Sequence, residues 1–386
     1  MRPTVDNGLT NFTNFTLHGD LPSVVVITSH RPQEIELTIS EMSLEWDMLE
    51  FDATASPSKR ISNTATETRK YIVRNQPDFI ILDCLETIGA AATAVASHYD
   101  IPILVRLVGN PWRKIQEERI EPARKNRDPG AYIIHRLSAG FNQYIFSRAY
   151  GFIVVSSELV EVVRQQTAVP ENRICVLPIP IQPTESKASL ADQLISHIDT
   201  DQLVLTVTNL KFEAKLNGVK TILSELEPVL QSNDITYLVA GGGQYHTELV
   251  AWINNRFSDP HIRQRIIVPG YVENVQQLYN IADIFVYVSY LDGYPNVILE
   301  AKIAGLPIVA NAAHGMIDQL NHGETGLLIN PEYDGELQSA VEELLSDSVL
   351  RNRLGTKAKV EAFNENDPTT VGRHLQNFLV QLPASS

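Results

Sequence analysis

Residues 284–310, with the sequence IFVYVSYLDGYPNVILEAKIAGLPIVA, decide the fold. An apolar run over 284–288 leads into a polar loop, a helical pattern over Asn296–Ala304 and a second apolar run over Pro307–Ala310. Two adjacent parallel strands need a crossover connection of this kind. The stretch therefore predicts a strand, helix, strand unit in a parallel sheet that is covered on both faces.

The same alternation of short apolar runs and helical patterns extends over most of the chain and predicts an α/β fold. Further strands are expected at residues 24–27, 48–51, 79–82, 101–107, 152–155, 174–177, 203–207, 235–240, 266–268 and 326–329. Further helices are expected at residues 216–231, 244–256, 274–281 and 334–346, with another amphipathic segment at the C-terminus.

A Pro-rich and then polar stretch over residues 178–201 interrupts the alternation and is interpreted as a linker. We therefore predict two Rossmann-like lobes with parallel sheets, one over residues 1–185 and one over residues 186–364, with a cleft between them. The segment 365–386 is the candidate to pack back on the first lobe. In folds of this kind, ligands bind outside the carboxyl ends of the strands.

Composition narrows the class of protein. A chain of 386 residues with 44% hydrophobic and 20% charged residues is typical of a globular protein of two domains. Its net charge of −15 argues against a nucleic-acid binder. Two cysteines, Cys84 and Cys175, are too few for a disulfide framework, and no histidine has metal-ligand spacing. Without a membrane span or signal-peptide pattern, a cytoplasmic protein without a metal is expected.

The loop and helix within residues 284–310 carry an unusual set of polar groups. Asp292 and Gly293 lie in the loop, and Pro295 stands where the helix begins. The free N–H groups of a helix N-terminus form a site for anions or hydroxyl groups. Glu300 is half-buried by its pattern, and a buried carboxylate needs hydrogen-bond donors such as sugar hydroxyls. The alternative is that Asp292 only shapes the turn and Glu300 forms an internal salt bridge.

A second motif, TVTNLKFEAKLNG at residues 206–218, joins a strand to the next helix. Lys211 and Lys215 lie near the N-terminus of that helix, where the helix dipole is already positive. Two cations at this position indicate a bound anion. The alternative is a pair of solvated lysines in a loop.

The order of these motifs resembles a known family of enzymes. DGYPNVILEA at 292–301 is followed by AGLPIVA at 304–310, HGMID at 314–318 and GETGLLINP at 323–331. This order is similar to the C-terminal half of the retaining glycosyltransferases of family 4, the group 1 type, whose signature is Glu, seven residues, Glu. The resemblance covers residues 203–350 well and the first 200 residues only in layout. It implies the two-lobed GT-B arrangement, a nucleotide-diphosphate sugar donor and no cofactor or essential metal.

The resemblance also implies roles for individual residues. Asp292 would contact the donor sugar and Glu300 the nucleotide ribose, although the family usually has Glu where this chain has Asp292. Lys215 matches the family's diphosphate-binding lysine, Asn209 stands where an arginine is usual, and Lys211 would supply the missing charge. The other residues expected at the donor are Gly241, Gly242, Tyr271, Val272, Gly293, Tyr294, Pro295 and Asn296, those from 293 to 296 through their backbone N–H groups.

The acceptor side is expected at the end of the strand over residues 101–107. Arg106, Gly109, Asn110 and Trp112 would lie there. The chain lacks the histidine that relatives often have at this point, and Thr28–Arg31 replaces their Gly-rich loop. The acceptor is therefore less well defined than the donor.

The charge distribution adds an inference of its own. Residues 106–148 hold nine basic and four acidic side chains, a net charge of +5, whereas the rest of the chain carries −20. Aromatic and aliphatic residues are interleaved with these cations. The segment is expected to contact an anionic membrane or to hold a lipid-diphosphate acceptor. The alternative is a solvated basic face.

Together with the motifs, the resemblance implies a retaining glycosyltransferase with Asp292, Lys215 and Glu300 as its catalytic residues. Its acceptor is expected to be a glycan or a lipid-linked molecule in lipid-linked or surface glycan biosynthesis, at the inner face of a membrane. The alternatives are a sugar-nucleotide epimerase on the same fold, since fold does not fix function, and a non-catalytic protein that binds glycans or nucleotides.

Overall fold

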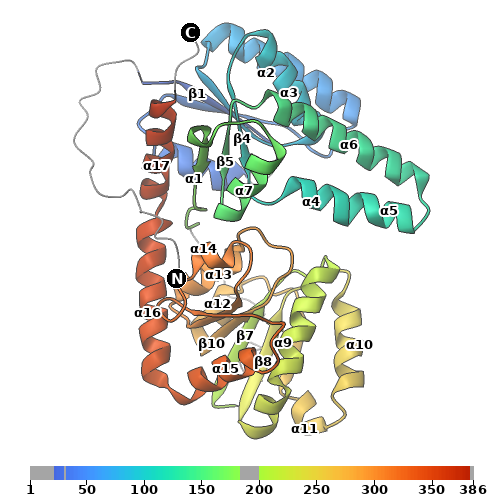
Figure 1. Cartoon of the computed structure of the whole chain (residues 1–386), viewed down its shortest axis with the longest axis vertical. Helices are drawn as coiled ribbons and strands as arrows, with labels where there is room; N and C mark the ends of the chain where they lie inside the picture. The colour runs from blue at the N-terminus through green and yellow to red at the C-terminus, as the bar shows by residue number, and fades with distance from the viewer. Residues whose placement is uncertain (1–20, 30–31, 183–199, 383–386) are drawn as a thin grey trace.

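Two parallel sheets form the framework of the protein. The computed structural model describes residues 21–29, 32–182 and 200–382, and within them the chain forms two α/β lobes (Figure 1). The N-terminal sheet has the six-strand order β2-β1-β3-β4-β5-β6, and the C-terminal sheet has the order β12-β11-β10-β7-β8-β9. All strand pairs in the two sheets are parallel. This is the two-lobed α/β arrangement that the sequence predicts.

The strands and helices have the following bounds. The N-terminal lobe contains β1 (Val24–Thr28), α1 (Pro32–Ser40), β2 (Trp46–Glu50), α2 (Pro57–Asn75), β3 (Phe79–Asp83), α3 (Glu86–His98), β4 (Ile103–Leu107), α4 (Pro111–Ile115), the π-helical turn η1 (Gln116–Ile120), α5 (Glu121–Lys125), α6 (Pro129–Arg148), β5 (Gly151–Val154), α7 (Ser157–Gln166), the 3-10 turn η2 (Glu171–Arg173) and β6 (Ile174–Val176). The C-terminal lobe contains β7 (Gln202–Val207), α9 (Glu213–Ser232), β8 (Ile235–Ala240), α10 (His246–Arg256), α11 (Pro260–Arg263), β9 (Ile266–Gly270), α12 (Gln276–Ile281), β10 (Ile284–Tyr287), α13 (Asn296–Ala304), β11 (Ile308–Asn311), α14 (Met316–Gln319), β12 (Leu327–Ile329), α15 (Glu336–Ser346) and α16 (Ser348–Glu365). The last helix is α17 (Pro368–Gln381).

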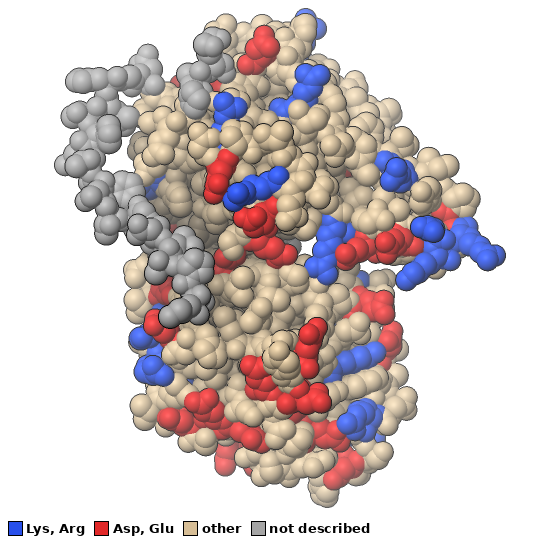
Figure 2. All heavy atoms as spheres, viewed as in Figure 1, with Lys and Arg blue, Asp and Glu red and all other residues tan. Residues whose placement is uncertain are grey.

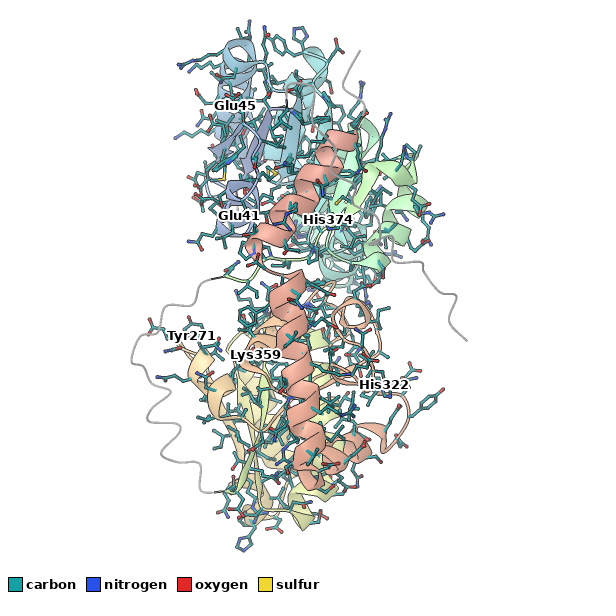
Figure 3. The ribbon with its side chains drawn as sticks, turned by 90° about the vertical axis from the view of Figure 1, so that its left-hand side faces the viewer. Glu41, Glu45, Tyr271, His322, Lys359 and His374 are labelled. Carbon is teal, nitrogen blue, oxygen red and sulfur yellow. The ribbon has the colours of Figure 1, made fainter. Side chains whose placement is uncertain are left out.

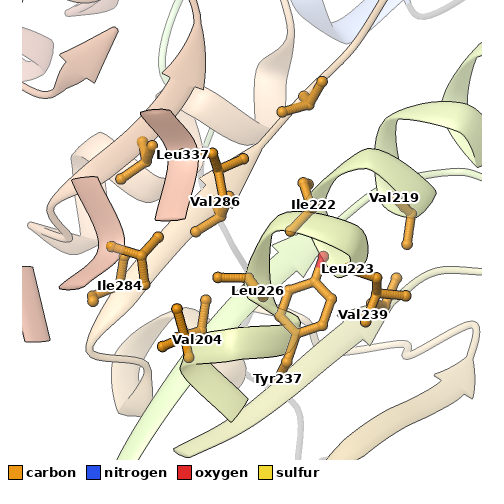
Figure 4. Packing of buried hydrophobic residues seen from close by; sticks show 14 of the residues in the cluster. Val204, Val219, Ile222, Leu223, Leu226, Tyr237, Val239, Ile284, Val286 and Leu337 are labelled. Atoms are coloured by element: carbon orange, nitrogen blue, oxygen red, sulfur yellow. The ribbon is translucent and has the colours of Figure 1, made fainter. Parts of the chain in front are cut away.

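Both faces of the sheets are buried, as unbroken apolar strands require. In β1, Val24 and Val26 belong to one hydrophobic cluster, whereas Val25 and Ile27 belong to another on the opposite face. In the C-terminal lobe, strands β7, β8 and β10 pack against α9 and α15 (Figure 4). Tyr237 is fully buried in that cluster, and its hydroxyl lies 2.8 Å from Thr206 Oγ1.

Helix α9 begins earlier than the sequence pattern predicts. The expected start was residue 216, but the helix begins at Glu213, so Lys215 lies in its first turn. Helix α16 was not predicted because its buried stripe consists mainly of small residues, Gly355, Ala358 and Ala362, beside Leu354. Small residues give little hydrophobic periodicity even when they allow close helix packing.

The C-terminal helices connect the two lobes (Figure 3). Helix α16 packs against α13, where Lys302 Nζ lies 2.6 Å from Glu361 Oε1. Helix α17 places Val371, Leu375 and Leu379 in a hydrophobic cluster of the N-terminal lobe. The expected lobe boundary at residues 185 and 186, and most of the expected linker, lie outside the described residues.

None of the helices in the described ranges combines the length and apolar character needed to cross a membrane.

The contact between α16 and α13 can be tested with a glycine variant. In Gly355→Ala, the new Cβ would lie 1.9 Å from the Gly305 carbonyl oxygen, so the helix must move. We expect a loss of about 1–3 kcal/mol in unfolding free energy, typical of overpacking, and a lower melting temperature by circular dichroism. Gly140 in α6 has no atom within 4 Å of the equivalent position, so Gly140→Ala should keep or raise the melting temperature. Equal melting temperatures for the two variants would contradict this packing.

Candidate active site

A cavity of about 680 Å³ lies between the lobes, at the carboxyl ends of strands from both sheets. The N-terminal lobe contributes the ends of β3 and β4 and the start of α4. The C-terminal lobe contributes Phe212, Leu291, Asp292 and Gly293. Of the residues predicted for the two substrates, the cavity brings together Arg106, Gly109, Asn110, Asp292 and Gly293.

Lys215 and Asp292 form an ion pair beside this cavity. Lys215 is only 4% exposed, and its ammonium group donates hydrogen bonds to the Asp292 carboxylate and the Tyr287 hydroxyl. The Tyr287 hydroxyl in turn donates to Asp292. Burial lowers the pKa of Lys215, and the charge of Asp292 opposes that shift. A lysine in the first turn of a helix needs a negative partner, because the helix dipole is positive there. In this structure the partner is Asp292.

Tyr287 remains a neutral donor in this arrangement. Burial, and then the negative charge of Asp292, raise the pKa of Tyr287 well above its ordinary value. The sequence analysis did not single out this residue, because a tyrosine within an apolar strand is typical of a core. Its position at the end of β10, five residues before Asp292, was the available signal.

Glu300 lies one turn into α13, next to a buried tyrosine. The Tyr279 hydroxyl donates a 2.7 Å hydrogen bond to Glu300 Oε2. Burial raises the pKa of Glu300, and this hydrogen bond partly offsets the shift. Among the described residues, Glu300 makes no ion pair, so the internal salt bridge considered as the alternative is absent there.

The Gly-rich turn after β8 is shaped by contacts with neighbouring loops. Gly241 has φ +143°, and a Cβ there would lie 1.6 Å from the Thr208 carbonyl oxygen. The Leu210 N–H donates to the carbonyl of Gly242 at 2.9 Å. Glycine at position 241 is therefore required by the fold itself, whether or not a ligand binds there.

Several predicted donor residues lie outside the interlobe cavity. Asn209 and Lys211 are exposed in the loop between β7 and α9. Tyr271 is 76% exposed at the surface of the C-terminal lobe (Figure 3), whereas Val272 is a buried core residue. Tyr294 packs against a core cluster of the N-terminal lobe.

The N-terminus of α13 has one fewer donor than the sequence analysis proposed. Pro295 is the N-cap of this helix and has no N–H group. Its carbonyl oxygen accepts hydrogen bonds from Ile298 N–H at 3.1 Å and from Gln319 Nε2 at 3.2 Å. Only the N–H groups of Gly293, Tyr294 and Asn296 are available from the proposed set.

On the acceptor side, Arg106 is held by two carboxylates. Its guanidinium lies 2.8 Å from Asp83 Oδ1 and 3.5 Å from Glu34 Oε2, and all three side chains are buried. Burial raises the pKa of Asp83 and the charge of Arg106 opposes the shift. Sequence analysis missed Asp83, although an acid at the carboxyl end of an apolar strand was a usable signal.

Asn110 and Trp112 have structural contacts of their own. The Asn110 side chain caps α4 by accepting a 3.0 Å hydrogen bond from Arg113 N–H. The Trp112 ring packs against Phe146 with 4.4 Å between centroids and lines a separate groove. Of the segment Thr28–Arg31, the last two residues lie outside the described ranges.

The cavity is rich in cations. Three carboxylates line it, those of Asp83, Glu86 and Asp292. Five cations line it, those of Arg60, Arg106, Arg113, Lys114 and Arg119. A cleft with an excess of cations attracts anionic ligands even in an acidic protein.

Polar contacts join the lobes around the cavity. Ser157 N–H donates to Asp318 Oδ2 at 2.9 Å, and His314 Nδ1 lies 3.0 Å from Glu158 Oε2. Arg113 Nη2 donates to the carbonyl of Tyr290 at 2.8 Å. The loop that carries Asp292 is therefore held against the N-terminal lobe.

No group of three or more His, Cys, Asp or Glu side chains suited to a metal ion occurs in the part of the chain that the structure describes. The absence of a metal requirement stays a prediction.

Comparisons with known proteins identify the class of the fold. Anabaena HepE in complex with UDP and glucose superposes with a TM-score of 0.64 at 15% identity, covering 94% of this chain and 100% of that chain. Sucrose-phosphate synthase of Thermosynechococcus elongatus superposes with a TM-score of 0.66 at 16% identity, covering 92% and 98%. The chain has the two-lobed GT-B fold.

The sequence comparisons are more specific for the C-terminal lobe. Residues 192–361 match the family described as glycosyl transferases group 1. An uncharacterized glycosyltransferase of Methanocaldococcus jannaschii is 22% identical over 234 residues, 58% of each chain. The N,N'-diacetylbacillosaminyl-diphospho-undecaprenol alpha-1,3-N-acetylgalactosaminyltransferase of Campylobacter jejuni is 25% identical over 60% of this chain and 61% of its own. The chain thus matches less than two thirds of the length of these relatives. Together these matches support a group 1 glycosyltransferase.

The raised pKa of the half-buried Glu300 carboxyl predicts how the stability of the protein depends on pH. Because its pKa is raised above the ordinary value of 4.5, the folded protein binds more protons than the unfolded chain above that pH. Glu300 therefore lowers the unfolding free energy as the pH rises. Glu300→Gln keeps the acceptor for Tyr279 and should raise the melting temperature at pH 7.5.

The gain from Glu300→Gln should shrink as the pH falls through the raised pKa of the folded state and vanish below pH 4.5, where the carboxyl becomes protonated in both states. Glu324→Gln, at an exposed position with the same change of charge, is the matched control and should show no such trend. A melting temperature that falls in Glu300→Gln at pH 7.5 would contradict the assignment.

Proposed function

We propose that the protein is a retaining glycosyltransferase that transfers a sugar from a nucleotide-diphosphate donor to a hydroxyl acceptor. The main observation behind the proposal is the Lys215–Asp292 ion pair. It lies beside the interlobe cavity, and the cations that line this cavity come from the N-terminal lobe. The group 1 match over residues 192–361 supports the class of reaction, and HepE is a structural neighbour in complex with UDP and glucose.

We propose that Lys215 and Asp292 exchange their hydrogen bonds with each other for hydrogen bonds to the bound donor. A diphosphate that reaches Lys215 takes over the hydrogen bonds of its ammonium group, and Asp292 is then free to accept from sugar hydroxyls. The N–H groups of Gly293 and Asn296 supply further donors at the start of α13. Lys211 and Asn209, which are exposed, are proposed to reach the diphosphate from the loop before α9.

One carboxylate oxygen of Glu300, Oε1, is available to accept a hydrogen bond from the nucleotide ribose. Tyr279 donates to Oε2, and within the described residues no hydrogen bond is made by Oε1. A carboxylate can accept several hydrogen bonds, and ribose hydroxyls are suitable donors. Gly241, Gly242 and the loop of Tyr271 and Val272 are proposed to line the rest of the nucleotide site.

The reaction builds negative charge on the leaving group. As the bond between the anomeric carbon and the phosphate oxygen breaks, Lys215 and the helix N–H groups stabilise the released diphosphate. The acceptor hydroxyl oxygen forms its bond to the anomeric carbon on the same face, and its proton passes to the departing phosphate. This route needs no protein nucleophile and retains the anomeric configuration.

The acceptor is proposed to bind at Arg106, Gly109, Asn110 and Trp112, on the wall formed by the N-terminal lobe. We propose a lipid-linked or surface-glycan acceptor and a position at the inner face of a membrane. The cation-rich cavity supports an anionic acceptor, and the Campylobacter relative is named for a diphospho-undecaprenol substrate. No metal or other cofactor takes part in this proposal.

The first test is a search for the donor and its product. We expect UDP-glucose or another uridine or guanosine diphosphate sugar to raise the melting temperature, with binding confirmed by calorimetry. The anomeric proton of the transferred sugar, followed by NMR, should keep the configuration of the donor. Conversion of the donor to its epimer without an acceptor would favour an epimerase, and binding without any turnover would favour a non-catalytic protein.

Replacement of Lys215 tests its role at the leaving group. Lys215→Ala should slow the release of nucleoside diphosphate from the donor by about 100-fold or more, because a preorganised charge at the leaving group is lost. Lys220→Ala, on the same helix, should retain the wild-type rate, because Lys220 pairs with Glu248 away from the cavity. Circular dichroism checks that both variants fold. A rate within threefold of wild type for Lys215→Ala would contradict the proposed role.

A further inference from the structure

Helices α4, α5 and the first half of α6 form an arm that projects sideways from the N-terminal lobe (Figure 1). The buried residues of α6 are Asn142, Ile145 and Phe146, all in its last two turns. Residues 129–141 of this helix have no buried side chain. The core of the lobe therefore holds only one end of the helix.

The free half of α6 carries apolar side chains on its surface. Tyr132 is 37% exposed, Ile133 58%, Ile134 61% and Leu137 59%. Ile133 and Leu137 are four residues apart, so they lie on the same face of the helix, one turn from each other. Single exposed apolar residues are ordinary, but four within six residues make a patch that is typical of an interaction surface.

Exposed basic side chains lie on the same arm as this patch, together with the exposed acids Glu117, Glu121 and Asp128. Arg124, Lys125, Arg127 and Arg136 are exposed, and none of them forms an ion pair with another residue in the described ranges. Figure 2 shows Lys and Arg gathered at the tip of the arm, while acidic side chains are spread over the face of the C-terminal lobe. Apolar side chains beside cations are the combination that binds the interface of an anionic bilayer.

A groove lies next to the interlobe cavity, at the base of the arm. It measures about 250 Å³ and lies between α4 and α6, where Trp112, Ile115 and Phe146 line it. Arg136 lies at this groove too, and Trp112 Nε1 is buried without a hydrogen-bond partner among the described residues. Ile115 and Asn142 line both the groove and the interlobe cavity. The groove and the acceptor side of the cavity are therefore neighbours.

We propose that the arm is a membrane-docking surface, which inserts Ile133, Ile134 and Leu137 into an anionic lipid bilayer while Lys125 and Arg127 contact lipid phosphates. Docking brings the groove and the cavity to the membrane surface, so a lipid-borne acceptor reaches the site without leaving the bilayer. This delivery of the acceptor rests on the proposed glycosyltransferase function, whereas the docking itself does not.

Vesicle co-sedimentation tests the docking. We expect the full-length protein to bind vesicles that contain phosphatidylglycerol at low salt, and to bind vesicles of pure phosphatidylcholine at least tenfold more weakly. Binding should fall as the salt concentration rises, because charge attraction is screened. Ile133→Asp with Leu137→Asp, and separately Lys125→Glu with Arg127→Glu, should each weaken binding at least tenfold.

A matched control separates the patch from a general effect of charge. Val349 and Val360 in α16 are 75% and 56% exposed, so Val349→Asp with Val360→Asp makes the same change on the other lobe. This control should weaken vesicle binding less than threefold. Equal losses in the control and the Ile133→Asp/Leu137→Asp variant, or no binding by the wild type, would overturn the proposal.

Two further measurements distinguish other outcomes. Sedimentation without vesicles tests whether the protein dimerises through the same patch. A wild-type dimer that is lost in Ile133→Asp/Leu137→Asp would show that the patch is a dimer interface and would overturn the membrane proposal. Donor binding by calorimetry is measured on the same variants and should stay within twofold of wild type. Vesicle binding without donor binding would leave the docking in place and contradict the proposed function.

Discussion

The burial of one lysine is the constraint on which the site depends. Lys215 is 4% exposed at the start of a helix, where both burial and the helix dipole disfavour a positive charge. It needs a counter-charge, and Asp292 supplies it from the loop after β10. That loop must turn back over α9 to make the pair. The same turn presents Gly293 to the other lobe and begins α13, so the position of Glu300 also follows from it.

The loop that carries Asp292 and Gly293 is closely packed between the two lobes. A Cβ at Gly293 would lie 3.2 Å from Gly109 Cα, and one at Gly315 would lie 1.9 Å from the Gly293 carbonyl oxygen. The loop is therefore packed between β4 of the first lobe and the turn before α14. The contacts around it include the polar pairs of Ser157 with Asp318 and His314 with Glu158, and Tyr294 packs against a core cluster of the N-terminal lobe. The loop is therefore held by both polar and apolar contacts between the lobes.

The sequence predicts the helices and strands better than it predicts which of them lie side by side in the fold. The bounds of α13 match the expectation because periodicity, Pro295 and Gly305 agree, and Gly305 has the left-handed φ of +81° that ends a helix. Lys215 and Asp292, by contrast, belong to separate motifs, and they meet only because β7 pairs with β10. That order is a property of the sheet that no local pattern contains. The pairing of Asp83 and Glu34 with Arg106 likewise joins three separate elements, β3, α1 and β4, although the position of Asp83 at the end of an apolar strand was a local signal.

The uneven charge of the chain fits one orientation at a membrane. A net charge of −15 repels an anionic surface, and at physiological salt that repulsion is screened over roughly 8 Å. Within this distance the local charge decides, and residues 107–148, which leave out the buried Arg106, carry +4. The proposed docking therefore needs an approach that leads with the arm and keeps the acidic C-terminal lobe away from the bilayer. If the protein docks as proposed, the acidic composition that argues against nucleic acid also selects which side of the protein faces the membrane.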